Sequence, residues 1–187
     1  MSRTAGRSKK AFSSSRVIIW HLGVAAALTY VTLGRRRIDY RFILLGAVLP
    51  DAIDPILGIF LFDGPAGRWI VYSLLAFLAV TLFVLLAFRG ERRLAVFGLA
   101  VGWLLHLVAD GMWAAPETFF WPLFGSSFGT SPAEPYSWDL FTAPADHVWT
   151  WVGELAGAAA LVWFWVAFEL GSRDRWRIFL KDGHLRA

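Results

Sequence analysis

The sequence predicts an all-α protein, a polytopic transmembrane bundle of about five helices with a cap loop on the outer face. Apolar residues occupy 57% of the 187 positions, and mean hydropathy is +0.54. They run continuously over about 20 residues, the length that crosses a bilayer, without the polar face of a soluble amphipathic helix. Ionisable residues nevertheless interrupt these segments, and because charge is costly in hydrocarbon such residues usually serve a function.

The apolar segments divide residues 17–170 into one membrane domain. We predict spans at residues 17–33, 42–62, 69–88, 94–113 and 149–170. Residues 1–16 form a polar, basic tail with too few apolar groups to fold. Residues 114–147 are rich in Pro, Gly, Ser and aromatics, which predicts an ordered cap at the membrane interface. Residues 171–187 form a basic cytoplasmic tail.

The first apolar segment also resembles a signal peptide, because a basic tail precedes it and Ala25 to Ala27 imitate a cleavage site. Two features favour a retained helix. His21 would lie inside the apolar part of the signal, and three arginines at positions 35–37 would follow cleavage, where positive charge opposes export.

The distribution of Lys and Arg predicts the orientation, since these residues concentrate in short cytoplasmic loops. Twelve of the 18 fall after the first span, after the third span or in the C-terminal tail. The other six are in the N-terminal tail and at Arg68, and the cap has none. We therefore expect an inner-membrane protein with a cytoplasmic C-terminus and an outer N-terminus; a first helix that enters without crossing is the alternative.

Helical rise predicts that three ionisable residues lie at one depth. Asp54 is 12 residues beyond Phe42 and His106 is 12 beyond Leu94, while His21 is 13 before Gly34. At 1.5 Å per residue, all three lie roughly 18 to 20 Å from the cytoplasmic ends of their spans. The orientation and the depths therefore agree.

Spacing within the helices adds two more carboxylates. His106 and Asp110 are four residues apart and share a helical face. Asp51 and Asp54 are three apart, and Pro55 disfavours helical geometry at Asp54, which predicts a break or kink there. Irregular backbone at such a depth must line a polar cavity.

These five residues are ligand types for a hydrated divalent metal: Zn is the first choice, and Mn, Fe or Mg are alternatives. The chain has no Cys, so its ligands would be nitrogen and oxygen atoms. A structural alternative is that His106 pairs with Asp110 and that the other carboxylates cap helices or contact Arg68. However, two neutral His and three Asp leave surplus negative charge, which an apolar site would offset with a cation.

At these residues the chain resembles the LexA-binding, inner-membrane-associated hydrolases (YdjM-like), also called membrane-bound metal-dependent hydrolases. The resemblance covers about His21 to Gly125 and implies a polytopic helical membrane protein with metal-dependent hydrolase activity. Its motif residues fall on His21, Asp51, Asp54, His106 and Asp110. The stretches that carry it are His21, Gly46-Ala47-Val48-Leu49-Pro50-Asp51 with Asp54, Gly102 to Asp110, and Trp121-Pro122-Leu123.

The chain departs from that family at the start of the third span, where the family has a His and this chain reads Tyr72-Ser73-Leu74. Tyr72 could still ligate or hydrogen-bond, but its high reference pKa makes it a poor ligand at neutral pH. Further supporting residues around the metal would be Ser73, His147 and Glu154. A cap by Asp146 and an interfacial His147 are the alternative for the start of the fifth span.

The resulting hypothesis is a hydrolase that activates water on a metal, with Asp51 as general base. Its depth suggests an amphiphilic lipid ester or phosphoester as substrate, with membrane lipid as the surrounding partner. A noncatalytic scaffold with a degenerate metal site is the second hypothesis, and an ion transporter is the third. We expect no nucleic acid partner, and the sequence leaves the oligomeric state open.

Overall fold

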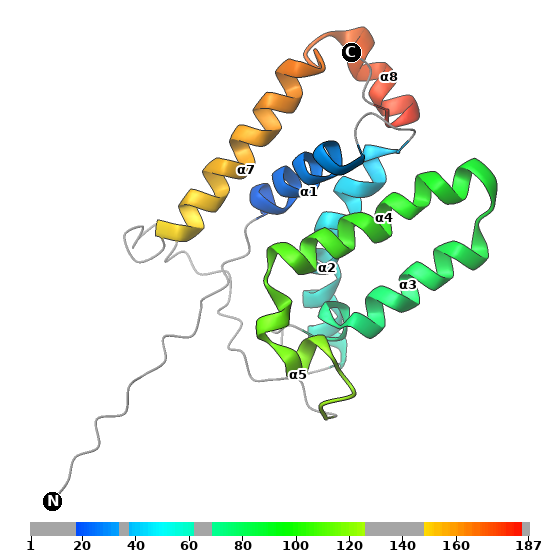
Figure 1. The fold of residues 1–187 in the computed structure, drawn as a ribbon, viewed down its shortest axis with the longest axis vertical. Coiled ribbons are helices and arrows are strands. Elements are labelled where there is room, and N and C mark those ends of the chain that lie inside the picture. The colour runs from blue at the N-terminus through cyan, green and yellow to red at the C-terminus, as the bar shows by residue number, and fades with distance from the viewer. Residues whose placement is uncertain (1–17, 34–37, 62–68, 126–147, 185–187) are drawn as a thin grey trace, which may run out of the picture.

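The computed structural model describes residues 18–33, 38–61, 69–125 and 148–184. The predicted N-terminal tail, most of the cap and His147 lie outside these ranges. The described residues form helices and no strand (Figure 1), which confirms the all-α fold class.

Five long helices correspond to the five predicted spans. They are α1 (Ile18–Leu33), α2 (Tyr40–Leu61), α3 (Leu74–Ala87), α4 (Gly90–Ala109) and α7 (Val148–Ala167). Short elements join some of them: the 3-10 turns η1 (Ile70–Tyr72) and η2 (Met112–Ala114), and α5 (Pro116–Phe119). The C-terminal segment, read from the sequence only as a tail, contains α8 (Arg173–Asp182).

Helix α2 does not break at Asp54, so the predicted break is wrong. The helix continues from Tyr40 through Pro50 and Pro55 to Leu61. Prolines remain in helices of membrane proteins where neighbouring helices supply partners for the affected backbone. Pro50 and Pro55 remove the helical donors to the carbonyls of Gly46 and Asp51. Helix α4 packs against this part of α2, where the His106 ring bonds the adjacent Ala47 carbonyl.

Glycines allow α2 and α4 to approach at backbone distance, and these two helices share the most extensive contact in the fold. A Cβ on Gly102 would overlap the Ile43 carbonyl, and one on Gly46 would overlap the Leu99 carbonyl. A Cβ on Gly98 would lie 3.1 Å from the Asp39 carbonyl oxygen. Later residues of α4 contact later residues of α2: Gly98 lies near Asp39, and Gly102 lies near Ile43 and Ala47. The two helices therefore run in the same direction.

A second glycine crossing joins α1 to α7. A Cβ on Gly157 would lie 2.5 Å from the Ile19 carbonyl oxygen and 2.6 Å from the Trp20 Cα. A Cβ on Gly23 of α1 would in turn overlap the Gly157 carbonyl oxygen. Small residues at such crossings are typical of helix packing in membranes, where van der Waals contact is a principal source of association. In Figure 1, α7 lies along α1, and α3 lies along α4.

The outer surfaces of α3 and α7 are apolar. Helix α3 has no charged residue, yet only Val84 is buried among its side chains. In the described residues, α4 is the one helix that is long and apolar enough to cross a membrane by length and composition. Ile18–Leu33, Leu74–Ala87 and Trp151–Ala167 are apolar but shorter, so the polytopic arrangement remains a prediction. Exposed apolar residues on α3 are Leu75, Leu78, Leu82, Phe83, Leu85 and Leu86.

The glycine crossing of α1 and α7 predicts different outcomes for two substitutions on the same helix. Gly157→Ala forces the backbones apart and should lower the free energy of unfolding by about 1–3 kcal/mol. Gly153→Ala is the matched control, because its Cβ would lie 3.6 Å from the Trp20 ring, an ordinary contact. Thermal unfolding in detergent measures both. Equal melting temperatures for the two variants would contradict the close crossing.

Candidate metal centre

Four ionisable side chains from three helices meet in the interior. His21 comes from α1, Asp51 from α2, and His106 and Asp110 from α4 and its C-terminal cap. One ligand atom from each of His21, Asp51 and His106 lies within 4.8 Å of the others. The two imidazole rings stack with their centroids 4.2 Å apart. Two positive rings at that separation would repel each other, which favours neutral imidazoles.

His106 presents one nitrogen to this group and uses the other to bond the backbone. Its Nδ1 lies 2.8 Å from the Ala47 carbonyl oxygen. A carbonyl only accepts, so Nδ1 carries the proton and the lone pair of the neutral ring is on Nε2. That Nε2 is buried and has no hydrogen-bond partner among the described residues. Its distances to Asp51 Oδ1 and Asp110 Oδ2 are 3.9 and 3.8 Å, too long for hydrogen bonds.

The lone pair of this buried imidazole nitrogen could coordinate a cation. A buried polar atom without a partner costs about 1–3 kcal/mol, and coordination to a metal would remove that penalty. With both imidazoles neutral, the group of four side chains also carries net negative charge from the carboxylates of Asp51 and Asp110. The donor set, two nitrogens with carboxylate oxygens, matches the ligands of Zn and related divalent metals.

His21 is oriented by Asp110. Its Nε2 lies 2.9 Å from Asp110 Oδ1, and the His21 side chain is buried. An ionised carboxylate only accepts, so Nε2 donates and the lone pair of the neutral ring is on Nδ1. A carboxylate that fixes the tautomer of a histidine is common around metal sites.

Asp51 is held by Tyr72. The Tyr72 hydroxyl donates to Asp51 Oδ1 over 2.5 Å, and the tyrosine is buried in η1. Its ring centroid lies 5.5 Å from that of His106. The residue that departs from the resembling family therefore reaches the site through its hydroxyl, as a donor to Asp51.

Asp54 has a different partner from Asp51. It is fully buried, and its Oδ1 accepts a hydrogen bond from the Trp69 backbone N–H over 3.0 Å. Trp69 directly precedes η1, so this bond holds the turn that carries Tyr72. The group of three potential ligand donors does not include Asp54.

Two other predicted supporting residues stabilise helix ends. Ser73 Oγ accepts from the Ala76 N–H over 3.1 Å and caps α3. Glu154 of α7 hydrogen-bonds the backbone of Ile19 and Trp20 at the start of α1 and interacts electrostatically with His21.

Sequence reasoning missed the carbonyl of Ala47, because a backbone oxygen carries no side-chain signature. Gly102, one turn before His106, was the available signal that α4 comes close to another backbone at this level.

The contact between Asp54 and Trp69 predicts a structural role. Asp54→Ala leaves a buried backbone N–H without its partner and should lower the free energy of unfolding by about 1–3 kcal/mol. Because the His21, Asp51 and His106 side chains are unchanged, the variant should retain any bound metal. Thermal unfolding and elemental analysis of the same sample test both outcomes. Loss of metal from a stably folded Asp54→Ala protein, with metal retained by Tyr72→Phe, would make Asp54 a ligand, because the second variant excludes an effect through Tyr72.

Comparison with known proteins supports the membrane assignment. A family model described as "YdjM inner membrane protein" matches residues 18–175. Searches of curated proteins and of solved structures gave no match. The matched region includes all five long helices and the four residues of the candidate metal centre. The chain therefore belongs to the YdjM inner membrane protein family.

Proposed function

We propose that His21, Asp51 and His106 hold a divalent metal and that the protein is a membrane-embedded, metal-dependent hydrolase. The observation that carries this proposal is the buried Nε2 of His106, which has its lone pair facing two carboxylates and no hydrogen-bond partner among the described residues. Two imidazoles and one carboxylate suit Zn first, with Mn, Fe or Mg as alternatives. Three protein ligands leave an open coordination position, as in catalytic sites.

Each proposed ligand has a supporting contact that would orient it before metal binds. Ala47 orients His106, Asp110 orients His21, and Tyr72 orients Asp51. Such supporting contacts typically contribute 10- to 100-fold to metal affinity or activity. The bound metal would supply Lewis acidity that lowers the pKa of water toward neutrality.

Asp110 is our candidate for the general base. The sequence analysis predicted that Asp51 is both a metal ligand and the general base. Because Asp51 is one of the three residues whose donor atoms lie close together, we favour it as a ligand. Asp110 directs Oδ2 to within 3.8 Å of His106 Nε2, and its side chain is 11% exposed. This partial exposure would give Asp110 a route for passing on an accepted proton.

We further propose the five-span topology with a cytoplasmic C-terminus and an amphiphilic ester or phosphoester substrate. Exposed Leu and Phe side chains on α3 and Val and Trp side chains on α7 support it, since large apolar surfaces are unfavourable in water. The distribution of Lys and Arg supports the orientation. A substrate that reaches a site between such helices would itself be partly apolar.

A noncatalytic scaffold is the second candidate. The observation that favours it is the hydrogen bonding among His21, Asp110, Tyr72 and Asp51, which links helices without a metal. The two candidates differ in metal content and in hydrolysis.

Metal content tests the proposed ligands. Purified wild-type protein should contain close to one divalent metal per chain, and His106→Ala should reduce it to background because a ligand is lost. His184→Ala is the matched control, since His184 lies beyond α8 beside Asp182. Elemental analysis of folded, detergent-solubilised protein gives the answer. A wild-type protein that stays metal-free in zinc-containing buffer would favour the scaffold.

Hydrolysis tests the role of Asp110. Asp110→Asn retains an oxygen that accepts from His21 but loses basicity, so metal content should persist while turnover falls about 10²- to 10⁴-fold. The measurement is hydrolysis of lipid ester and phosphoester substrates in mixed micelles. Undiminished turnover in a metal-loaded Asp110→Asn protein would remove Asp110 from the mechanism.

A further inference from the structure

Helix α8 differs in character from the helix before it. The last turns of helix α7 carry exposed Val162, Trp163, Trp165 and Val166. Five residues, 168–172, separate α7 from α8, which begins with the sequence Arg173-Asp174-Arg175-Trp176-Arg177. The indole rings of Trp165 and Trp176 lie 5.4 Å apart at the junction. Trp side chains concentrate at the boundary between hydrocarbon and water. In a protein of an inner-membrane family, the apolar surface of α7 therefore ends at the level where α8 starts.

One side of α8 packs on the bundle, and the other side is cationic. Phe179 is buried in the core with Tyr40 and Phe168. Arg173, Arg177 and Lys181 are exposed, and their spacing of four residues places them in one row along the helix. A helix with this division between faces suits the surface of a membrane.

In the part of the chain that the structure describes, no ion pair involves a cation of this row. Among the described residues, neither Arg177 nor Lys181 forms an ion pair, whereas Arg175 lies 3.6 Å from Glu169 and Arg41 pairs with Asp39. The basic residues near α8 thus differ in whether a carboxylate pairs with them. Arg41 and Arg175 are engaged by carboxylates, and Arg177 and Lys181 remain available for an external anion.

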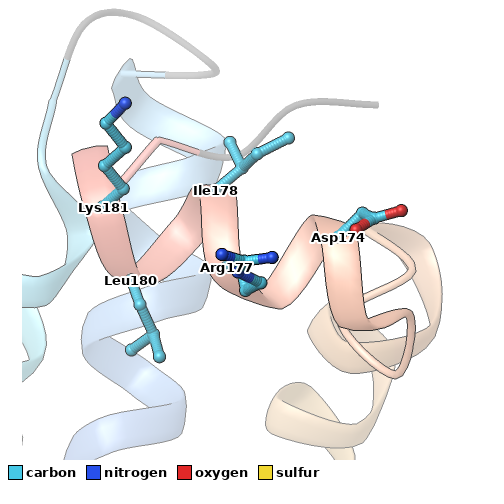
Figure 2. Close-up of a pocket in the computed structure, with 5 residues that line it drawn as sticks. All are labelled: Asp174, Arg177, Ile178, Leu180 and Lys181. Atoms are coloured by element: carbon cyan, nitrogen blue, oxygen red, sulfur yellow. The ribbon is translucent and has the colours of Figure 1, made fainter.

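Arg177 and Lys181 line a pocket on α8. The open pocket of about 640 Å³ is bounded by Asp174, Arg177, Ile178, Leu180 and Lys181 (Figure 2). Its two cations and two aliphatic side chains offer both charge and apolar contact. The pocket is open to the surroundings, so it suits a headgroup that lies on the surface of α8 and is not enclosed by the protein.

A set of hydrogen bonds fixes α8 to the start of α2. The Tyr40 N–H donates to the Gly183 carbonyl over 2.9 Å, and Arg41 Nη1 donates to the Leu180 carbonyl over 2.5 Å. Asp39 holds the Arg41 side chain by two bonds of 2.9 and 2.6 Å. This pairing raises the pKa of the Arg41 guanidinium, mainly through the hydrogen bond, so the connection stays charged at neutral pH.

The close contact of Gly183 with Asp39 shows how tight this connection is. Gly183 has a φ of 70°, a left-handed conformation that favours glycine. A Cβ there would overlap the Asp39 carboxylate. The basic row is therefore held in a fixed position relative to α2.

We propose that α8 is a binding site for an anionic phospholipid, with Arg177 and Lys181 contacting the headgroup phosphate. Leu180 and Ile178 contact the apolar region next to the headgroup. Asp174 accepts from headgroup hydroxyls, such as those of a glycerol headgroup. The positive charges of Arg177 and Lys181 disfavour a headgroup that carries its own cation, such as a quaternary ammonium. Charge complementarity and the position of α8 at the end of α7 select a lipid, and this site is separate from the candidate metal centre.

The test is lipid binding by the full chain in neutral detergent, measured by native mass spectrometry. Wild-type protein should retain phosphatidylglycerol and not phosphatidylcholine. The double variant Arg177→Gln with Lys181→Gln should raise the apparent Kd for phosphatidylglycerol about 30-fold, the factor expected for two cations at a membrane surface. Both residues are exposed, so the variant should keep the melting temperature of the wild type.

The matched control is Arg92→Gln with Arg93→Gln, which removes the same charge from exposed positions on α4 and should leave the Kd nearly unchanged. A charge-conserving Arg177→Lys with Lys181→Arg variant should restore binding. Equal losses in the two neutralised variants would overturn the proposal. Competition by millimolar inorganic phosphate, or duplex DNA binding that depends on Arg177 and Lys181, would overturn it in favour of a free-phosphate or nucleic-acid site.

Discussion

The backbone contact between α2 and α4 is the constraint on which the candidate metal centre depends. Gly102 lets α4 lie directly against the Ile43 carbonyl, and one turn later His106 meets the Ala47 carbonyl over 2.8 Å. A side chain larger than hydrogen at position 102 would separate the helices and lengthen that hydrogen bond. The bond fixes the His106 tautomer and leaves the Nε2 lone pair facing Asp51 and Asp110.

The remaining elements place the other two potential ligands, His21 and Asp51, beside His106. The crossing at Gly23 and Gly157 holds α1 against α7, and α1 brings the His21 ring to 4.2 Å from that of His106. Asp54 holds the Trp69 N–H at the start of η1, and η1 carries the Tyr72 hydroxyl to Asp51. Each potential ligand is thus fixed by a neighbour, which reduces the reorganisation that metal binding would require.

The sequence predicted the helical class and the vertical alignment of His21 with His106, because apolar run length and helical rise are local properties. The rotation of each helix about its own axis was not predictable. That rotation decides which side chains face the site: Asp51 faces the histidines, whereas Asp54 bonds the Trp69 backbone. The continuity of α2 through Pro55 and the folding of α8 also depend on tertiary contacts. The hydrogen bond from Tyr72 to Asp51 was likewise not predictable, since Asp51 lies 21 residues away in another helix.

We propose that His106 Nε2 is a metal ligand beside His21 and Asp51. Anomalous diffraction at the zinc edge, from crystals of zinc-loaded protein, would locate the metal. We predict one strong anomalous peak bounded by these three side chains, at about 2.0–2.1 Å from His106 Nε2. A map from fully loaded crystals with no peak there, or with its only peak at another group of residues, would show that His106 is not a ligand.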